Sequence, residues 1–438
     1  MADSTTPLQP FPDAPLWPRI LLISDYLPQD ATSVHGAFQR LRRHVDTLQG
    51  IGEVDVIFLW PWDPASWNEG AKANLAALRQ RWGLSGRTDL VFSRFTCQLG
   101  KIRILLPAFL QSLLGRRTIR RDAATLDAIA GIARQVRPDL VFAHRMGAIL
   151  LAVRALARIC PIVADFDDVE HQRMRRQAAR IASWPERLRL RLAAWLTERL
   201  EREALRKVRT GLVCSESDGA FFRPLPAGAQ LAVLPNAAAL QQPPAPASAP
   251  TALFVGMLRY WPNAEGLVWL VQEVWPVVRR ALPTARLLIA GLGSDELGLA
   301  DAAAGIETHG FAADLAALYA QARLALCPLH IASGTRIKII EAAMFARPTV
   351  STSIGAEGLA FAPGNSIAIA DGAEQFARAC IDLLGNPTAA EAMGFAARKK
   401  ARGLYSPEIV QAQLSELCRQ VLAGARKASI RPAPADIR

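Results

Sequence analysis

The chain has 438 residues, of which 51% are hydrophobic, and this is enough for two domains that each bury a core. No stretch reaches the roughly 18 consecutive apolar residues of a membrane-spanning helix, and the N-terminus lacks a secretory signal, so we expect a cytoplasmic protein. The six cysteines are scattered without a C-x-x-C pair, which argues against disulfide or zinc frameworks. The net charge of +12 favours an anionic partner: nucleic acid, an anionic membrane surface or a phosphorylated substrate.

Strand and helix patterns alternate in the first half of the chain. Residues 1–18 are Pro-rich and are expected to be a disordered leader. The segment 36–50 repeats apolar residues at helical spacing and predicts a helix. The strand patterns are RILLIS (19–24), EVDVIFLW (53–60), DLVFAH (139–144), PIVADF (161–166) and GLVCSE (211–216). This alternation predicts a parallel sheet covered on both faces, in a Rossmann-like acceptor-side domain over 19–236.

The same rhythm restarts after a linker over 237–250 that holds four prolines. Strand patterns follow at 251–258, 285–291, 323–329 and 348–353, with helices predicted at 262–280 and 334–346. They predict a second Rossmann-like domain over 251–405, which would bind the donor. A helix over 406–425 and a disordered tail over 426–438 complete the chain. Two facing parallel sheets would place a cleft between the C-terminal ends of their strands, where open α/β sheets bind ligands.

The window SGTRIKIIEAAMFARPTVSTSIGAEGL carries the clearest chemical signal. Gly334 and Thr335 are predicted to open a helix, whose free N–H groups would attract an anion. Arg336 and Lys338 add two cations beside that turn, so the segment predicts a pyrophosphate site. Glu341 follows among apolar neighbours. Its carboxylate would either accept hydrogen bonds from a ribose diol or lie at the surface near Lys338.

This window resembles the C-terminal signature of family-4 glycosyltransferases of the GT-B fold, bacterial surface-polysaccharide type, with its pattern GTRIK…EAMA.GRPVVST..G.EGL. FVGMLRYWPNAEGLVWL (254–270), LLIAGLGSD (287–295) and the segment 310–329 match the family in order and spacing. PDLVFAH (138–144) and ADFDD (164–168) match more weakly. The resemblance covers roughly 19–425 and is specific in the second half. It implies two Rossmann-like domains facing each other and a nucleotide-sugar donor.

Carried over by position, the resemblance implies a role for each matching residue. Glu341 would hold the ribose hydroxyls and His144 would contact the transferred sugar, which makes them the two catalytic candidates. Backbone at Gly310 and Phe311 would face the base, and Gly36 would let a loop approach the phosphates. The implied donor-binding set is Gly36, Gly256, Arg259, Gly310, Phe311, Ser333, Gly334, Thr335, Arg336, Lys338 and Glu341.

Two positions depart from the family pattern. Many members carry a glutamate where this chain has Ser333. Taken without the resemblance, this serine is typical of a helix N-cap. The lysine that often follows an early arginine is not evident after Arg259, so Lys338 is the candidate for that role from the other side.

The resemblance implies a retaining reaction that needs no metal, with a UDP- or GDP-sugar as donor and a saccharide acceptor, lipid-linked, in surface polysaccharide synthesis. Cations and helix N-termini would stabilise the charge that develops on the leaving diphosphate. If the reaction inverts instead, Asp167 or Asp168 is the candidate general base. No cofactor is expected.

Basic residues gather in two segments with interleaved Leu and Trp. Six lie between Lys101 and Arg121 without an acid, and twelve lie between Arg173 and Arg209 against four acids. Such helices suit an anionic bilayer and predict peripheral association with the inner face of the membrane. The alternative is a solvated helix face packed on its own domain.

Three other functions fit parts of the sequence. G-x-G in LLIAGLGSDE is found in Rossmann oxidoreductases, but the third glycine and the later acidic residue are missing. The basic charge would suit a nucleic-acid binder, but the aromatic platforms of RNA-binding sheets are missing, so no nucleic-acid partner is expected. Asp165-Phe166-Asp167 spells the D-x-D of metal-dependent, single-domain glycosyltransferases.

Overall fold

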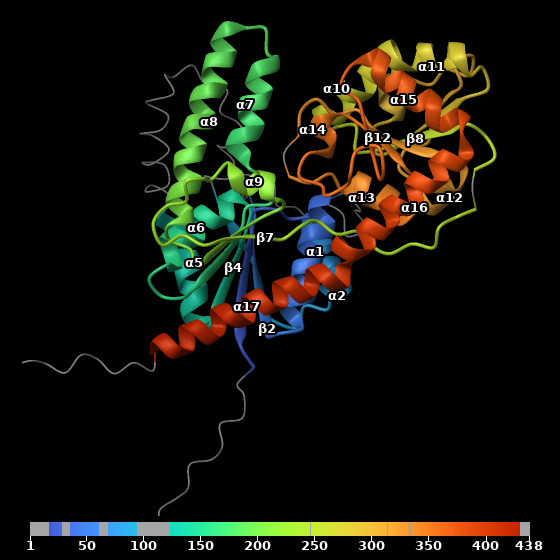
Figure 1. Ribbon diagram of the computed structural model, residues 1–438. Helices are drawn as coiled ribbons and strands as arrows, with labels where there is room; N and C mark the ends of the chain where they lie inside the picture. The colour runs from blue at the N-terminus through green and yellow to red at the C-terminus, as the bar shows by residue number, and fades with distance from the viewer. Residues whose placement is uncertain are drawn as a thin grey trace, which may run out of the picture.

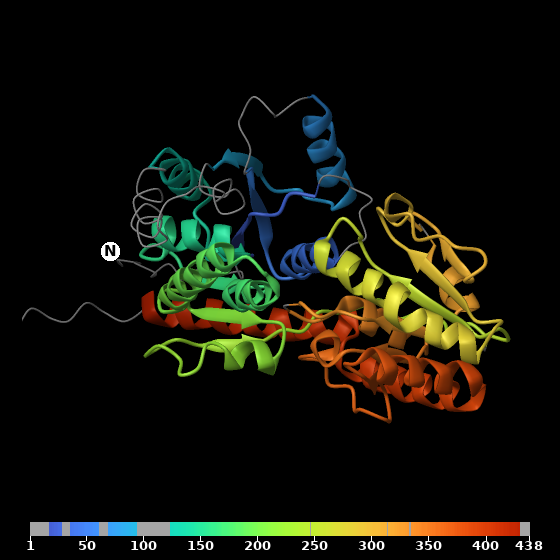
Figure 2. The same cartoon turned by 90° about the horizontal axis from the view of Figure 1, so that it is seen from above.

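Each half of the chain folds around its own parallel sheet, and helices cover both faces of each sheet (Figure 1). The computed structural model describes residues 17–28, 36–60, 69–93, 123–245, 247–312, 314–332 and 334–429. Most of the predicted leader and most of the predicted tail lie outside these ranges. Residues 426–429, predicted as part of the tail, are helical instead. Seen from above, the two domains lie side by side (Figure 2).

The N-terminal sheet has seven parallel strands in the order β3-β2-β1-β4-β5-β6-β7. Its strands are β1 (Arg19–Ser24), β2 (Glu53–Trp60), β3 (Thr88–Phe92), β4 (Leu140–His144), β5 (Ile162–Asp165), β6 (Thr210–Val213) and β7 (Leu231–Val233). Its helices are α1 (Gly36–Gln49), α2 (Glu69–Arg81), α5 (Ala123–Val136), α6 (Met146–Leu156), α7 (Glu170–Arg180), α8 (Trp184–Leu205) and α9 (Glu216–Ala220).

The C-terminal sheet has six parallel strands in the order β10-β9-β8-β11-β12-β13. They are β8 (Thr251–Val255), β9 (Arg286–Ala290), β10 (Ile306–Thr308), β11 (Leu324–Cys327), β12 (Thr349–Ser351) and β13 (Ala368–Ile369). The helices are α10 (Trp261–Trp269), α11 (Trp275–Ala281), α12 (Leu315–Gln321), α13 (Ile337–Met344), α14 (Ser353–Ala356), α15 (Ala373–Gly385), α16 (Pro387–Leu404) and α17 (Pro407–Ser429), with a π-helical turn at Leu270–Val274 and a 3-10 turn at Asp295–Leu297.

The apolar strands are buried because alternate side chains enter cores on opposite faces of the sheet. In β1, Leu21 and Ile23 join one core cluster, and Ile20 and Leu22 join the other. This two-sided burial explains why RILLIS is a continuous apolar run rather than an alternating one.

Helix α17 links the two domains at their surface. It leaves the C-terminal domain after α16 and runs across the base of the N-terminal domain (Figures 1 and 2). Val410, Leu414 and Cys418 enter the same core cluster as Leu41 and Val45 of α1. The last helix therefore packs as part of the N-terminal domain, although it follows the second domain in sequence.

Most predicted elements are confirmed, and two helix predictions need correction. The predicted helix from Gly334 begins only at Ile337, because Gly334 has a φ of +66° that no α-helix contains. The predicted helix over 262–280 is interrupted by the π-helical turn before α11. Pro276 lies in the first turn of α11 and has no N–H for the ladder, which accounts for the interruption.

Both sheets reverse their strand order at one point, between β1 and β4 and between β8 and β11. Open parallel sheets bind ligands beyond the strand ends at such a point. Ser24 and His144 end β1 and β4, and Gly256 follows β8. In the described part of the chain no helix is both long and apolar enough to cross a membrane, and the five cysteines found there are free and buried.

Candidate functional site

The turn before α13 faces the N-terminal domain at close range. A Cβ on Gly334 would lie 2.6 Å from Oδ1 of Asp168 and 3.3 Å from the carbonyl oxygen of Asp167, so only glycine fits there. Among the residues that the structure describes, no side chain caps the start of α13 at Arg336. The first N–H groups of α13 are therefore left to bind an anion at the domain junction.

Helix α1 also begins at this junction. Gly36 is its first residue, and a Cβ there would lie only 3.1 Å from Cδ1 of Ile337, the first residue of α13. Two helix N-termini, each with a partial positive charge, therefore meet where the two domains touch. Gly36 thus allows α1 to approach α13 closely, and its predicted approach to the phosphates stays a prediction.

Lys338 lies beside the end of β8. Its ammonium donates to Oδ1 of Asn263 at 2.8 Å and lies 4.4 Å from the centre of the Phe254 ring. A Cβ on Gly256 would lie 2.9 Å from Nζ, so this glycine makes room for the ammonium. Burial is the main cause that lowers the pKa of Lys338 to about 8, and Arg336 lowers it further. Lys338 thus places a titratable cation at the switch point of the sheet.

The guanidinium of Arg336 is buried and holds the surrounding loops. It donates to the carbonyl oxygen of Gly355 at 2.7 Å and to the carbonyl oxygens of Gly334 and Glu357. Burial lowers the pKa of Arg336. Its contacts are those of a side chain that shapes the turn, so its predicted role as a phosphate-binding cation stays a prediction.

Glu341 projects from α13 without a hydrogen-bond donor among the described residues. Burial raises the pKa of its carboxyl to about 7, opposed by Arg43 and Lys338. Arg43 comes from α1, so this carboxylate lies between the two domains near cations from each. A carboxylate with free acceptor capacity next to a cationic turn suits a diol attached to a phosphate.

The remaining donor-domain candidates lie on outer loops. Arg259 is exposed and paired with Glu296 at 2.5 Å. Gly310 adopts a φ of +55°, and its carbonyl oxygen accepts from the backbone N–H of Gly291 at 2.7 Å. Phe311 follows with half of its surface exposed. The structure places these residues on neighbouring loops, and their predicted contacts with phosphate and base stay predictions.

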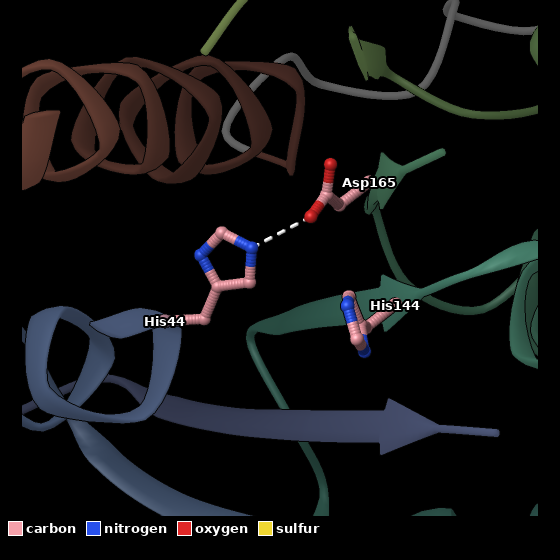
Figure 3. A group of neighbouring side chains, drawn as sticks. All are labelled: His44, His144 and Asp165. Atoms are coloured by element: carbon pink, nitrogen blue, oxygen red, sulfur yellow. Dashed lines mark hydrogen bonds and ion pairs between the residues drawn. The ribbon is translucent and has the colours of Figure 1, made fainter. Parts of the chain in front are cut away.

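His144 lies at the end of β4 and is fully buried. Its Nδ1 lies 3.0 Å from Oγ of Ser24, and its Nε2 has no partner among the described residues. Burial lowers its pKa well below the usual range, so the ring is neutral at pH 7. His44 of α1 lies next to it and bonds Asp165 at 2.6 Å (Figure 3).

The cluster in Figure 3 has ligand atoms close enough to hold a metal ion, because one atom from each of His44, His144 and Asp165 lies within 4.8 Å of the others. Both oxygens of Asp165, however, already accept from the Arg40 guanidinium at 2.8 and 2.7 Å. A divalent cation there would lie beside a fixed positive charge, so the donor set does not fit a metal. The two-sheet fold likewise contradicts the D-x-D reading of Asp165 and Asp167.

A buried hydrogen-bond chain connects this cluster to the turn before α13. Arg40 donates to Oδ1 of Asn236 at 3.1 Å. The Asn236 amide in turn donates to Oγ1 of Thr335 at 3.1 Å and to its carbonyl oxygen at 3.3 Å. Thr335 is therefore held from the N-terminal domain. Arg40 and Asn236 are not among the residues predicted from the sequence, because no short-range pattern points to them.

A second link joins α7 to the C-terminal domain. Arg176 donates to the carbonyl oxygen of Ala332 at 2.6 Å and to Oε1 of Glu357 at 2.7 Å. Close by, Gly358 leaves room for Ser215, whose Oγ would lie 2.5 Å from a Cβ on that glycine. These contacts hold the domains together on both sides of the turn before α13.

Asp167 and Asp168 differ in their surroundings. Asp167 has a φ of +57° and forms ion pairs with Arg40 at 3.5 Å and Arg145 at 3.8 Å. Asp168 faces Gly334, and burial followed by the nearby Asp167 charge raises its pKa to about 7.

Two predictions about functional residues fall outside the described part of the chain. Ser333 and the basic segment 101–121 lie there, so the structure does not test their roles.

The G-x-G of the oxidoreductase alternative lies in the loop after β9. A dinucleotide site needs an α-helix to begin directly after that loop. Here a 3-10 turn of three residues follows, at Asp295–Leu297. The loop Gly291–Gly293 therefore lacks the helix N-terminus that would bind a pyrophosphate.

Comparisons with known proteins agree with the fold. The family model described as "Glycosyl transferases group 1" matches residues 249–386. A curated relative, an uncharacterized 44.6 kDa protein in the cps region of Klebsiella pneumoniae, is 30% identical over 152 residues, which are 33% of this chain and 39% of that protein. The match thus spans about two fifths of the relative's length.

Solved glycosyltransferase structures superimpose over most of the chain. Sucrose-phosphate synthase from Thermosynechococcus elongatus matches with a TM-score of 0.63 and 17% identity, over 93% of this chain and 100% of that one. Anabaena HepE in complex with UDP matches with a TM-score of 0.64 and 14% identity, over 92% and 100%. At these identities the likeness shows the fold. The chain therefore has the GT-B fold, and residues 249–386 match the model of the glycosyl transferases group 1 family.

Proposed function

We propose that the chain is a nucleotide-sugar-dependent glycosyltransferase that transfers a sugar from a nucleoside diphosphate to a saccharide acceptor. The observation that carries this proposal is that α13 places a partly buried ammonium, Lys338, close to a free carboxylate, Glu341. Beside them the N-termini of α1 and α13 meet. A diphosphate needs the cation and the helix N-termini, and a ribose diol needs the carboxylate. The family match over 249–386 supports this reading.

In the proposed reaction, negative charge develops on the diphosphate as the bond from the sugar C1 to oxygen breaks. Lys338 and the two helix N-termini stabilise that charge in place, which lowers the barrier. Groups of this kind act without a divalent metal, and the resemblance favours retention at C1. The resemblance assigns His144 to the transferred sugar. Its Nε2 has no partner in the described structure but is buried, so this contact requires the end of β4 to open to the ligand.

The proposed acceptor is a lipid-linked saccharide of surface polysaccharide synthesis. The name of the Klebsiella pneumoniae relative places it in a cps region, which supports this assignment. An acceptor of this kind would be presented at a membrane surface, so the chain needs a face that suits one.

Helix α8 offers such a face. Figure 1 shows α7 and α8 projecting from the N-terminal domain as a hairpin. Trp184, Leu188, Leu192 and Trp195 form an exposed stripe at helical spacing, with Trp184 71% and Trp195 43% exposed. Arg199 lies over the Trp195 ring, 4.2 Å from its centre. Aromatic and leucine side chains with flanking arginines suit the headgroup region of an anionic bilayer, and we place this stripe there.

Vesicle sedimentation tests the membrane face. The wild-type chain should sediment with vesicles that contain phosphatidylglycerol and should remain free with pure phosphatidylcholine. The double variant Trp184→Ser, Trp195→Ser should lose binding, whereas Phe395→Ser, which removes another exposed aromatic from α16, should bind like wild type. Equal binding by both variants would remove the stripe from the proposal.

Release of nucleoside diphosphate from a panel of UDP- and GDP-sugars tests the activity. The variant Glu341→Ala loses the charged acceptor for the ribose and should turn over about 10- to 100-fold more slowly at low donor concentration. Glu374→Ala, which changes an exposed glutamate in the first turn of α15, is the matched control and should retain wild-type turnover. Full activity of Glu341→Ala would contradict the assignment of the site.

A further inference from the structure

One carboxylate at the domain junction is not used by the proposed donor site. Asp168 lies between β5 and α7, after the positive-φ turn at Asp167. Its Oδ1 lies 2.6 Å from the position that a Cβ of Gly334 would occupy. The side chain therefore reaches from the N-terminal domain onto the turn that precedes α13.

This carboxylate has no protein partner in the described part of the chain. No hydrogen bond reaches it, and no cation lies within ion-pair distance, although Arg145 and Arg173 act on it from further away. It is only partly buried, so a ligand can reach its oxygens. A partly desolvated carboxylate with nothing to accept from is unfavourable unless a ligand supplies the donor.

The position of Asp168 restricts what that ligand group can be. The turn at Gly334 leads into the helix N-terminus where the diphosphate is proposed to bind, and the ionised carboxylate of Asp168 repels a phosphate from direct contact. The group covalently attached to the diphosphate is the donor sugar, and its hydroxyls are hydrogen-bond donors. The C-terminal domain supplies no carboxylate of its own at this turn, because residues 329–340 contain neither Asp nor Glu.

We infer that Asp168 accepts a hydrogen bond from a hydroxyl of the donor sugar, so that the N-terminal domain contributes to recognition of the sugar. The inference rests on the proposed function. It gives the sugar a partner on the opposite side of the junction from Lys338 and Glu341. If Asp168 instead acted as a general base on the acceptor, replacing it would leave the affinity for the donor unchanged. Binding measurements therefore separate the two roles.

Calorimetric titration tests the inference on the full chain. UDP, GDP, UDP-glucose and GDP-mannose are titrated into the wild type, and the base that binds is used thereafter. Asp168→Asn and Asp168→Ala should bind the free nucleoside diphosphate within about twofold of wild type, but should bind the nucleotide sugar about 10- to 100-fold more weakly. Glu198→Gln, which removes an ion-paired carboxylate from α8, is the control and should bind both ligands normally.

Each other outcome has a defined meaning. Equal loss for nucleotide and nucleotide sugar, or no loss for either, would overturn the inference. Unchanged affinity with slower release of nucleoside diphosphate would overturn it in favour of the base role. If the wild type binds neither the nucleotides nor their sugars, the proposed function itself fails. Melting curves of both variants, close to that of wild type, confirm that the comparison is made on folded protein.

Discussion

Replacing Lys338 with methionine should stabilise the protein while weakening nucleotide binding. The ammonium is kept at the end of β8 with one side-chain hydrogen bond, to Asn263, and an aromatic ring below it. Burial disfavours its charged form, and no carboxylate pairs with it within 4 Å in the described residues. Methionine has a similar length and carries no charge, so it removes the cost of burial and keeps the packing.

The size of the expected stabilisation follows from the pKa of Lys338. Lowering the pKa of Lys338 from 10.5 to about 8 corresponds to a cost of about 3 kcal/mol for keeping the ammonium charged in the folded protein. Loss of the hydrogen bond to Asn263 offsets about 1 kcal/mol of the gain. Lys338→Met should therefore raise the free energy of unfolding at pH 7 by about 1–2 kcal/mol.

The stabilisation by Lys338→Met should depend on pH. The unfolded chain holds the Lys338 proton up to about pH 10.5, but the folded protein releases it near pH 8. Between these values the unfolded state binds more protons, so the stability of the wild type rises with pH. The cost of the ammonium falls below about 1 kcal/mol at pH 10, and the advantage of the methionine variant should disappear.

Urea denaturation at pH 7 and pH 10 measures this effect, and titration with UDP or GDP at pH 7 measures binding. Nucleotide affinity should fall about 10- to 100-fold in Lys338→Met, because a charge-assisted contact to phosphate is lost. Lys400→Met changes an exposed lysine of α16 and should alter neither property. A methionine variant that is less stable than wild type at pH 7, or one whose difference does not change with pH, would refute the reasoning.

Three further perturbations test other contacts of the site. Because burial raises the pKa of Glu341 to about 7, nucleotide affinity of the wild type relative to Glu341→Gln should fall as the pH drops from 8 to 6; parallel titration curves would contradict this. Asn236→Ala breaks the chain to Thr335 and should lower the free energy of unfolding by about 1–3 kcal/mol in urea; an unchanged midpoint would show that the chain does not stabilise the fold. Arg176→Ala cuts the link to Glu357 and should increase the radius of gyration in solution scattering and weaken nucleotide-sugar binding about two- to tenfold; unchanged scattering would exclude a role in closure.

Local patterns were sufficient to predict most of the fold. RILLIS and EVDVIFLW were predicted as strands because continuous apolar runs are typical of a parallel sheet buried on both faces, and both are strands with the predicted bounds. Four strands were missed: β3, β7, β10 and β13. All four are edge strands of only two to five residues, too short for a clear apolar pattern. The start of α13 was misplaced because propensity does not reveal the positive φ of Gly334.

The site was predictable only where its residues share one segment. Lys338 and Glu341 lie on one helix, and the resemblance named both. The partners that position the site are distant in sequence: Asn263 lies 75 residues from Lys338, and Asn236 lies 99 residues from Thr335. No spacing rule in the sequence predicts such pairs, because these residues come together only when the chain folds.

A crystal structure of the chain with its nucleoside diphosphate is the most direct test of the donor site. The account predicts the phosphates at the N-terminus of α13, with an oxygen about 3 Å from Nζ of Lys338 and the ribose hydroxyls on Glu341. Phosphates bound instead at the loop Gly291–Gly293, or a ribose that does not contact Glu341, would contradict it.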